Sequence, residues 1–275
     1  MMQGASAAVA ASVSRRVFGM LTSGDRAERW QRINHRGEVV TLAQGPAVSA
    51  GSLAGIVTVP GLSGTDRLAA GVAIGGAGAL GMLDDLTGAT EVKGLRGHLG
   101  ALRSGEVTTG TVKLVGLAVS GLVAGSLARR GRGGVIDAAL AGAVIAGSAN
   151  LANLLDLRPG RATKVFIAAS AAPLLAGGVS GAVLTGPVAA AGALLPEDLS
   201  ERSMLGDTGA NAIGASWGVA MAAALQRRTL AGTLLALVAL TIASERVSFS
   251  RVIEQVPALR ALDELGRLPG PRQPA

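Results

Sequence analysis

Seven long apolar runs, separated by short segments rich in Arg and Gly, limit what this chain of 275 residues can fold into more than any other feature. A membrane-spanning helix needs about 20 mostly apolar residues. The runs cover residues 47–63, 67–83, 110–128, 134–155, 164–195, 208–225 and 229–243, and the fifth is long enough for two spans. Charged residues make up only 16% of the chain, which excludes a disordered protein. We therefore predict an all-α, polytopic transmembrane bundle of about eight to ten spans.

Small residues dominate these runs, and close helix packing explains that composition. GAGALG at 76–81 and GLVAG at 121–125 have the pattern of helix contact faces. The stretch 2–21 carries Arg15 and Arg16 after its apolar part, whereas a signal peptide carries its charges before it. We therefore expect a short first span or an interfacial helix there.

The basic residues predict the orientation. If segments 24–44, 84–109, 156–164, 196–207 and 244–275 share one side, that side, with Lys113 just inside the next span, holds about 17 of the 25 Lys and Arg. The positive-inside rule makes it the cytoplasmic side. Two clusters, around Arg129 and Arg227, fall on the opposite side. Residues 1–243 then form the membrane domain, and 244–275 form a cytoplasmic amphipathic segment and tail. We expect no nucleic-acid partner despite the net charge of +7, because the charge is scattered and aromatics make up 2%.

Acidic residues gather at the predicted cytoplasmic ends of several spans. Asp84 and Asp85 close the run GAGALGMLDD, where two adjacent carboxylates repel each other and call for a cation or a functional role. A solvated helix end is the alternative. Asp207 lies between Gly206 and Gly209, which allow close backbone approach, while the helix that follows offers N–H donors to an anion. An N-cap aspartate is the alternative for Asp207.

The sequence SANLANLLD places Asn150, Asn153 and Asp156 on one face of a helix, because they are three residues apart. The amides have a simpler interpretation as interhelical hydrogen-bonding groups. Asp156, at the end of that face, favours a metal or phosphate site. Arg158, Arg161 and Lys164 follow at once and are suited to phosphate.

Carboxylate and amide oxygens at this end of the bundle suit Mg²⁺ better than Zn²⁺. The chain has no Cys and only two His, which excludes a thiolate or histidine-rich metal site. No Walker pattern is present, so an ATPase is not expected. A Mg²⁺ site among arginines at a membrane points to the transfer of a phosphorylated group. We expect the acidic motifs to converge on one cleft.

Several motifs resemble the polyprenyl-phosphate N-acetylhexosamine-1-phosphate transferase family, which includes the bacterial enzyme that makes the first lipid intermediate of peptidoglycan. GMLDDLTG resembles the aspartate pair of that family, NLANLLD the N-x-x-N-x-x-D motif, and MLGDTGANAIG the M-G-D-x-G-S-x-x-L-G motif. TVKLVG resembles the lysine-containing start of the span after the aspartate pair, and INHRGEVVTLAQGPA the N-terminal H-R-G segment. The resemblance covers roughly residues 30–225, with the motifs in the family's order.

The resemblance implies a Mg²⁺-dependent enzyme of the plasma membrane, with its active face in the cytoplasm. It would move a sugar-1-phosphate from a UDP-sugar to a polyprenyl phosphate and release UMP, in cell-wall biogenesis. The residues that it implies for catalysis are Asp84, Asp85 and Asp207; for the metal, Asp207, Asn153 and Asp85; and for substrate, His35, Lys113, Asn150, Asn153, Asp156, Arg158 and Arg161. The sequence leaves the sugar, the lipid length and a homodimer open.

The chain departs from the family pattern at several places, including Met204 where an aromatic residue is common and a longer spacer between Asp85 and Lys113, and two departures keep other functions open. Pro159 replaces the aspartate that the family carries after the second motif, and no His follows His98, so the C-terminal histidine cluster of the family is missing. One alternative is therefore a catalytically inactive scaffold or lipid-phosphate binding protein of envelope assembly. A transporter is the other, since polar residues inside a membrane also line transport pathways.

Overall fold

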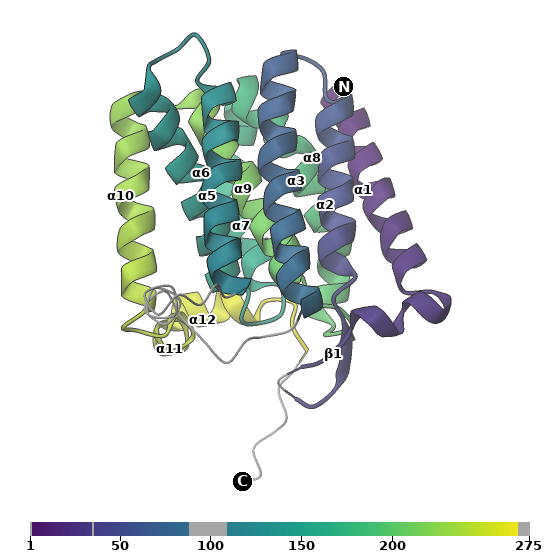
Figure 1. Cartoon of the computed structure of the whole chain (residues 1–275). Coiled ribbons are helices and arrows are strands. Elements are labelled where there is room, and N and C mark those ends of the chain that lie inside the picture. The colour runs from purple at the N-terminus through teal and green to yellow at the C-terminus, as the bar shows by residue number, and fades with distance from the viewer. Residues whose placement is uncertain (1, 35, 88–108, 269–275) are drawn as a thin grey trace.

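A bundle of long helices forms the body of the protein, which a computed structural model describes for residues 2–34, 36–87 and 109–268 (Figure 1). The helices of the bundle are α1 (Met2–Leu21), α2 (Gln44–Thr58), α3 (Gly64–Thr87), α5 (Thr109–Ala128), α6 (Val135–Leu155), α7 (Arg161–Ala176), α8 (Gly178–Leu199), α9 (Gly206–Ala224) and α10 (Arg227–Ser244). The predicted all-α bundle is confirmed. Among the described helices, α3, α5, α6, α8 and α10 are long and apolar enough to cross a membrane, which suggests a membrane protein. The total of eight to ten spans stays a prediction.

The long apolar run 164–195 holds two helices, as its length predicted. α7 ends and α8 begins at Gly177, whose φ of 72° and ψ of −144° are open to glycine and strained for other residues. The N-terminal stretch forms one continuous helix through Arg15 and Arg16 and packs in the bundle, where Ser14 Oγ donates a hydrogen bond of 2.9 Å to the carbonyl of Ala47 on α2.

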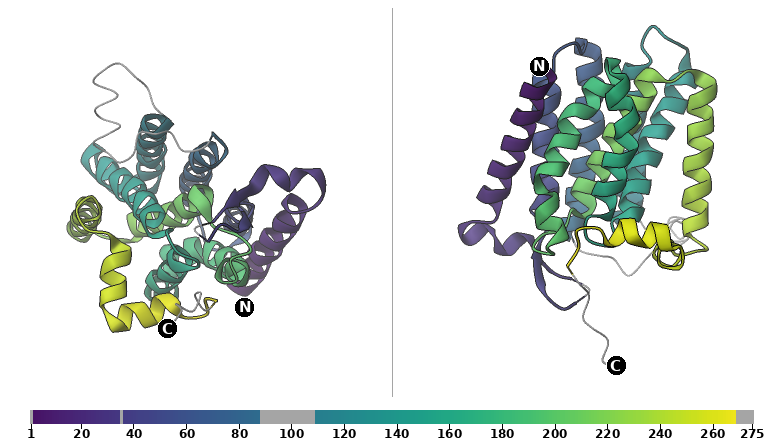
Figure 2. Two further views of the ribbon diagram at one scale, coloured as in Figure 1. Left: turned by 90° about the horizontal axis from the view of Figure 1, so that it is seen from below. Right: turned by 180° about the vertical axis from the view of Figure 1, so that it is seen from behind.

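Short elements cover one end of the bundle. A chain segment with two 3-10 helices, Gly24–Arg26 and Glu28–Trp30, leads from α1 into a two-stranded antiparallel sheet of β1 (Gln31–Ile33) and β2 (Val39–Thr41). At the same end, α11 (Phe249–Gln255) and α12 (Pro257–Glu264) lie across the bundle instead of along it (Figure 2). The segments that the basic residues assigned to one side lie at this end wherever they are described (Figure 1).

Helix α9 lies in the centre of the bundle and is buried along almost its whole length. Glycines let its neighbours approach it closely. A Cβ atom on Gly81 of α3 would overlap the carbonyl oxygen of Asp207, and a Cβ on Gly218 of α9 would lie 2.6 Å from the Cα of Ile145 on α6. The predicted contact face at 121–125 is also confirmed, because a Cβ on Gly121 would lie 2.7 Å from the carbonyl oxygen of Gly142.

The arginines at the opposite end have a structural role that the sequence does not reveal. Arg129 Nη1 donates to the carbonyl oxygens of Ala222 and Leu225 at 3.1 and 2.9 Å, at the C-terminal end of α9. Arg132 Nη1 donates to the carbonyl of Ala223 at 2.6 Å. Cationic side chains are favourable at a helix C-terminus, where carbonyls lack helical partners. These arginines therefore cap α9, which accounts for basic residues on the side that the positive-inside rule leaves poor in charge.

The contact between α3 and α9 predicts opposite effects for two Gly→Ala changes on one helix. Gly81→Ala should destabilise the protein by about 1–3 kcal/mol, because the new methyl group overlaps the α9 backbone. Gly75→Ala should be neutral or stabilising by up to about 1 kcal/mol, because nothing lies within 4 Å of a Cβ there and Ala favours helix. Thermal unfolding of both variants in detergent measures the difference. Equal midpoints would show that α3 and α9 do not meet at Gly81.

Candidate functional site

Four helices bring polar side chains together at one end of the bundle. α3 contributes Asp84 near its C-terminus, α5 contributes Lys113 in its first turn, α6 contributes Asn153 in its last turn, and α9 contributes Asp207 at its start. Because antiparallel helices alternate direction, starts and ends of different helices meet at the same level. The structure therefore brings together residues that lie far apart in the sequence, and we call Asp84, Lys113, Asn153 and Asp207 the acidic cluster.

The ammonium group of Lys113 lies at the centre of the acidic cluster. Its Nζ donates to Asp84 Oδ2 at 2.9 Å and forms an ion pair with Asp207 Oδ2. The side-chain amide of Asn153, oriented to satisfy both of its ends, donates to Asp207 Oδ1 at 2.7 Å and accepts from Lys113 Nζ at 3.2 Å. The Lys113 side chain is only 13% exposed, so these ionic contacts are shielded from solvent. Side-chain oxygens of Asp84, Asn153 and Asp207 thus surround the Lys113 ammonium.

Asp85 has a different role from that of Asp84. Its carboxylate accepts hydrogen bonds from the backbone N–H of Asp207 at 3.1 Å, from the backbone N–H of Thr208 at 2.9 Å and from Thr208 Oγ1 at 2.6 Å. The first turn of a helix has N–H groups without helical partners, and Asp85 satisfies two of them. Arg32 of β1 in turn donates to the backbone carbonyl of Asp85. These contacts count against Asp85 as a catalytic or metal-binding residue and assign it to holding α9 against α3.

Asp156 directly follows α6 and lies close to the backbone N–H of Gly206 at the start of α9, which opposes the rise in its pKa. Burial raises the pKa of the Asp156 carboxyl well above its usual range, and the charges of Asp198 and Asp207 raise this pKa further. Of the N–H groups that the sequence offered to a bound anion, those of Asp207 and Thr208 are occupied by the carboxylate of Asp85.

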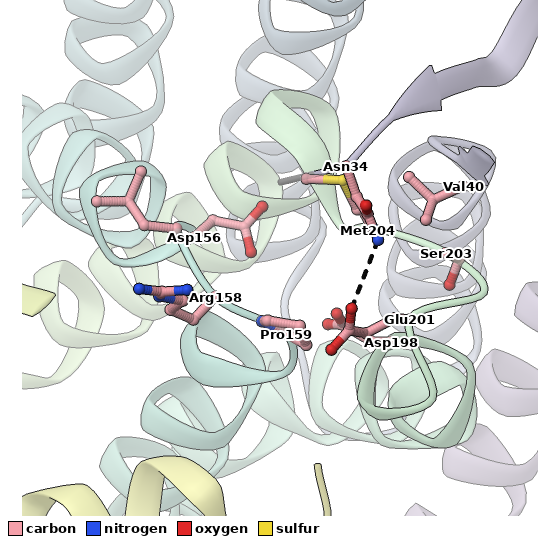
Figure 3. Close-up of a pocket in the computed structure, with 10 residues that line it drawn as sticks. Asn34, Val40, Asp156, Arg158, Pro159, Asp198, Glu201, Ser203 and Met204 are labelled. Atoms are coloured by element: carbon pink, nitrogen blue, oxygen red, sulfur yellow. Dashed lines mark hydrogen bonds between the residues drawn. The ribbon is translucent and has the colours of Figure 1, made fainter. Parts of the chain in front are cut away.

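A small pocket of about 40 Å³ opens beside Asp156 (Figure 3). Its polar side chains are those of Asn34, Asp156, Arg158, Asp198, Glu201 and Ser203, and its apolar wall includes Val40, Leu157, Pro159 and Met204. Asn34 Nδ2 donates to Glu201 Oε2 at 3.4 Å, which joins the segment before β2 to the loop before α9. The pocket thus lies beside the C-terminal end of α6, the helix that carries Asn153 of the acidic cluster.

Sequence reasoning missed Thr208 and most of this pocket's polar lining. Gln44 is fully buried, accepts from Ser203 Oγ at 2.6 Å and donates to Asp198 Oδ2 at 3.4 Å. Glu201 has a φ of 55°, which is uncommon for a residue other than Gly, and forms an ion pair of 2.8 Å with Arg36. A buried glutamine at the start of an apolar run was the one available sequence signal. The pairing partners depend on the tertiary fold.

The remaining predicted site residues lie apart from the acidic cluster. Asn150 precedes Asn153 by one turn of α6 and takes no part in the hydrogen bonds of the cluster that the described residues form. Arg158 lines the pocket and pairs with Glu254 at 3.4 Å. Arg161 is 2% exposed, and its guanidinium contacts Asp263 and Ser250, so the prediction that it binds phosphate does not fit its surroundings. His35 lies outside the described residues.

The fit of a divalent cation depends on Lys113. Among the residues that the structure describes, no group of three or more His, Cys, Asp or Glu side chains is arranged to hold a metal ion. The oxygens of Asp84, Asn153 and Asp207 nevertheless surround the Lys113 ammonium, which occupies the position that a metal ion would take. Hard oxygen donors of this kind are those that Mg²⁺ takes. The donor set fits Mg²⁺ on the condition that the ammonium moves aside.

The sequence matches no protein-family model, and no curated protein matches it.

The different contacts of Asp84 and Asp85 predict different losses of stability when each is replaced by Ala. Asp85→Ala should cost about 1–3 kcal/mol, because it leaves N–H groups of α9 without a partner. Asp84→Ala leaves those N–H groups paired, and we expect a smaller loss. Thermal unfolding of the two variants under identical detergent conditions compares them. If Asp84→Ala is the more damaging change, Asp85 is not the residue that holds α9.

The ion pair between α7 and α12 predicts a pH dependence. Burial opposes the ionisation of Asp263, but its hydrogen bonds to Arg161 and the charges of Arg161, Arg267 and Lys164 outweigh this and lower its pKa. With a depressed folded-state pKa, the stabilisation is complete above the unfolded-state pKa of about 3.9 and is lost as the pH falls through the folded-state value. The difference in unfolding midpoint between wild type and Asp263→Asn should therefore be full at neutral pH and shrink below about pH 4.

Glu264→Gln is the control for this measurement, because Glu264 pairs with Arg260 while both side chains are about 60% exposed. It should leave the midpoint nearly unchanged at every pH. A difference between wild type and Asp263→Asn that persists unchanged at pH 3 would contradict the ion-pair account.

Proposed function

We propose that this protein is a membrane phosphoglycosyl transferase that moves a sugar-1-phosphate from a UDP-sugar to a polyprenyl phosphate and releases UMP. The observation that carries the proposal is the convergence of Asp84, Lys113, Asn153 and Asp207 from four helices at one end of an apolar bundle. These are the residues that match the aspartate pair, the lysine and the two later motifs of the transferase family. Their meeting in space adds support that the order of the motifs could not supply.

The position of the acidic cluster suits a lipid phosphate acceptor. Five helices of the bundle have the length and hydropathy of membrane spans, and three of them, α3, α5 and α6, carry cluster residues near their ends. A polyprenyl chain can therefore stay among lipids while its phosphate reaches polar side chains at the boundary. The phosphate-facing group would be Lys113, whose ammonium would exchange one of its contacts with Asp84, Asn153 and Asp207 for a phosphate oxygen.

In the proposed reaction, an oxygen of the lipid phosphate forms a bond to the sugar-linked phosphorus of the UDP-sugar. The bond from that phosphorus to the bridging oxygen breaks, and UMP leaves with the electron pair. Asp84 lies on the Lys113 side of the cluster and would orient the attacking phosphate or accept its proton. Asp156 would contact the nucleotide, which would bind outside the small pocket, because a pocket of about 40 Å³ holds little more than one water molecule. Mg²⁺, held by Asp207 and Asn153, would supply neutralisation of the diphosphate charge.

Asp207 does not serve as the helix cap that was its alternative interpretation. The N-cap position of α9 is Leu205, and Asp85 accepts hydrogen bonds from the backbone N–H groups of Asp207 and Thr208 in the first turn. The Asp207 carboxylate points instead at Lys113 and Asn153. This geometry leaves its negative charge for the cluster, as a metal- or phosphate-binding role requires.

One observation favours a second function, that of a non-catalytic lipid-phosphate binding protein. Lys113 already forms ion pairs with both Asp84 and Asp207, so these described residues form an ion-pair network without a divalent cation. Such a protein would bind polyprenyl phosphate through Lys113 and release no UMP. An assay that measures both lipid binding and UMP separates the two functions.

Asp207→Asn should abolish the transfer without unfolding the protein. The amide keeps the shape of the side chain but removes the charge, and we expect turnover to fall by at least about a hundredfold. The measurement is UMP release by purified protein with polyprenyl phosphate, saturating Mg²⁺ and a panel of UDP-sugars, with the lipid product identified by mass. Asp66→Asn is the matched control, because Asp66 lies at the start of α3, at the other end from Asp84, and should keep full turnover.

Four results distinguish the candidates. UMP release by wild type and Asp66→Asn but not by Asp207→Asn supports the transferase. Normal turnover by a folded Asp207→Asn protein removes Asp207 from the reaction. Binding of polyprenyl phosphate without UMP from any UDP-sugar favours the non-catalytic function, and substrate counterflow in vesicles without UMP favours a transporter.

A further inference from the structure

The segment Phe249–Leu265, which contains α11 and α12, crosses the end of the bundle and is attached to it mainly by polar contacts (Figure 2). We call this segment the strap. Arg161 of α7 binds Asp263 through two hydrogen bonds of 2.7 and 3.0 Å, and its third contact is to Ser250 Oγ at 2.8 Å. Lys164 Nζ donates to the carbonyls of Leu262 and Leu265 at 3.0 and 3.1 Å. The polar edge of the strap is therefore fixed on α7.

The apolar edge of the strap is not covered by the bundle. Leu262 and Leu265 are 63% and 66% exposed, and Leu259 is also exposed. Between this edge and the ends of α7 and α8 lies a groove of about 400 Å³. Its apolar walls come from both sides and comprise Val165, Ile167, Ala168, Leu195, Ile253, Leu259, Leu262 and Leu265. An apolar groove with exposed leucines on its rim is unfavourable in water.

The helix before the strap, α10, has an exposed apolar surface. α10 leads directly into the strap, and only 11% of its most apolar stretch is buried in the bundle. Leu235, Val238, Leu240 and Ile242 are exposed along it. A helix this apolar and this little buried must face hydrocarbon if it crosses a membrane. The strap therefore begins at the boundary between lipid and water, where an amphipathic helix lies in the plane of the interface.

Attraction to acidic headgroups does not explain the placement of the strap. The strap has two Arg and three acidic residues, so its net charge is −1. Acidic headgroups therefore give it no net attraction to the membrane surface. Beside the polar contacts with α7, apolar contact is the remaining driving force.

We propose that the strap lies in the membrane interface on the side of the acidic cluster, and that acyl chains of the surrounding phospholipids fill the groove between it and α7 and α8. The strap then holds the segment from Asp156 to Arg161 in place, since Arg158 and Arg161 both contact the strap. The occupant is bulk phospholipid, which requires an apolar groove open to the leaflet and no headgroup selectivity.

Fluorescence quenching in reconstituted vesicles tests the proposal. The chain has no Cys, so Leu262→Cys, Val165→Cys and Arg260→Cys each give one site for an environment-sensitive fluorophore. Leu262 and Val165 line the groove, whereas Arg260 lies on the polar side of α12 beside Glu264. The quenchers are phosphatidylcholine with a nitroxide on its acyl chain and aqueous iodide.

We expect acyl-chain quenching at positions 262 and 165 to exceed that at position 260 by at least about twofold, and iodide quenching to show the reverse order. Vesicles of phosphatidylcholine alone and vesicles that also contain phosphatidylglycerol should give the same result. Equal iodide quenching at all three positions would show that the strap lies in water. Protection of position 262 from both quenchers, with disulfide cross-linking between two Leu262→Cys chains, would make a second copy of the chain the occupant and overturn the proposal.

Discussion

The close backbone contacts of α9 are the constraint on which the rest of the structure depends. Gly81 on α3 and Gly218 on α9 remove the Cβ atoms that would hold the helices apart, so α3, α6 and α9 pack at backbone distance. Aspartate and asparagine side chains are short. Only helices this close allow Asp207 of α9 to reach Asn153 of α6 while its backbone N–H binds Asp85 of α3. Packing of apolar helices by small residues and convergence of the polar site are therefore one feature of the fold.

Four of the acidic residues at this end form two pairs with different roles. Asp85 accepts hydrogen bonds from backbone N–H groups at the start of α9, and Asp156 lies close to the N–H of Gly206 there, so this pair contacts the end of that helix. Asp84 and Asp207 bind the Lys113 ammonium and carry the charge that the proposed phosphate transfer would use. Without the first pair, the N–H groups of α9 would be unpaired inside the protein. The second pair is held in place by the first, which explains why so many carboxylates can gather in one place.

Most of the cationic side chains discussed above also have structural partners. Arg161 and Lys164 attach the strap, and Arg129 and Arg132 cap the far end of α9. Among these residues, it is Lys113 that pairs with Asp84 and Asp207. A basic residue near a phosphate motif in the sequence is thus a weak indication of phosphate binding, because a carbonyl or carboxylate elsewhere in the fold competes for it.

The sequence alone determined the all-α bundle and most helix boundaries, because the alternation of apolar runs with polar segments follows directly from helix length and burial. It also indicated Asp84, Asn153 and Asp207 as members of one site, since these polar residues recur at the ends of apolar runs that face the same side. Tertiary structure decided which residues pair. The separation of Asp85 from Asp84, the diversion of Arg161 to Asp263 and the pocket formed by Asn34 and Glu201 all depend on contacts between segments far apart in the chain. Such contacts are set by how helices pack and rotate against one another, and local sequence pattern does not encode that.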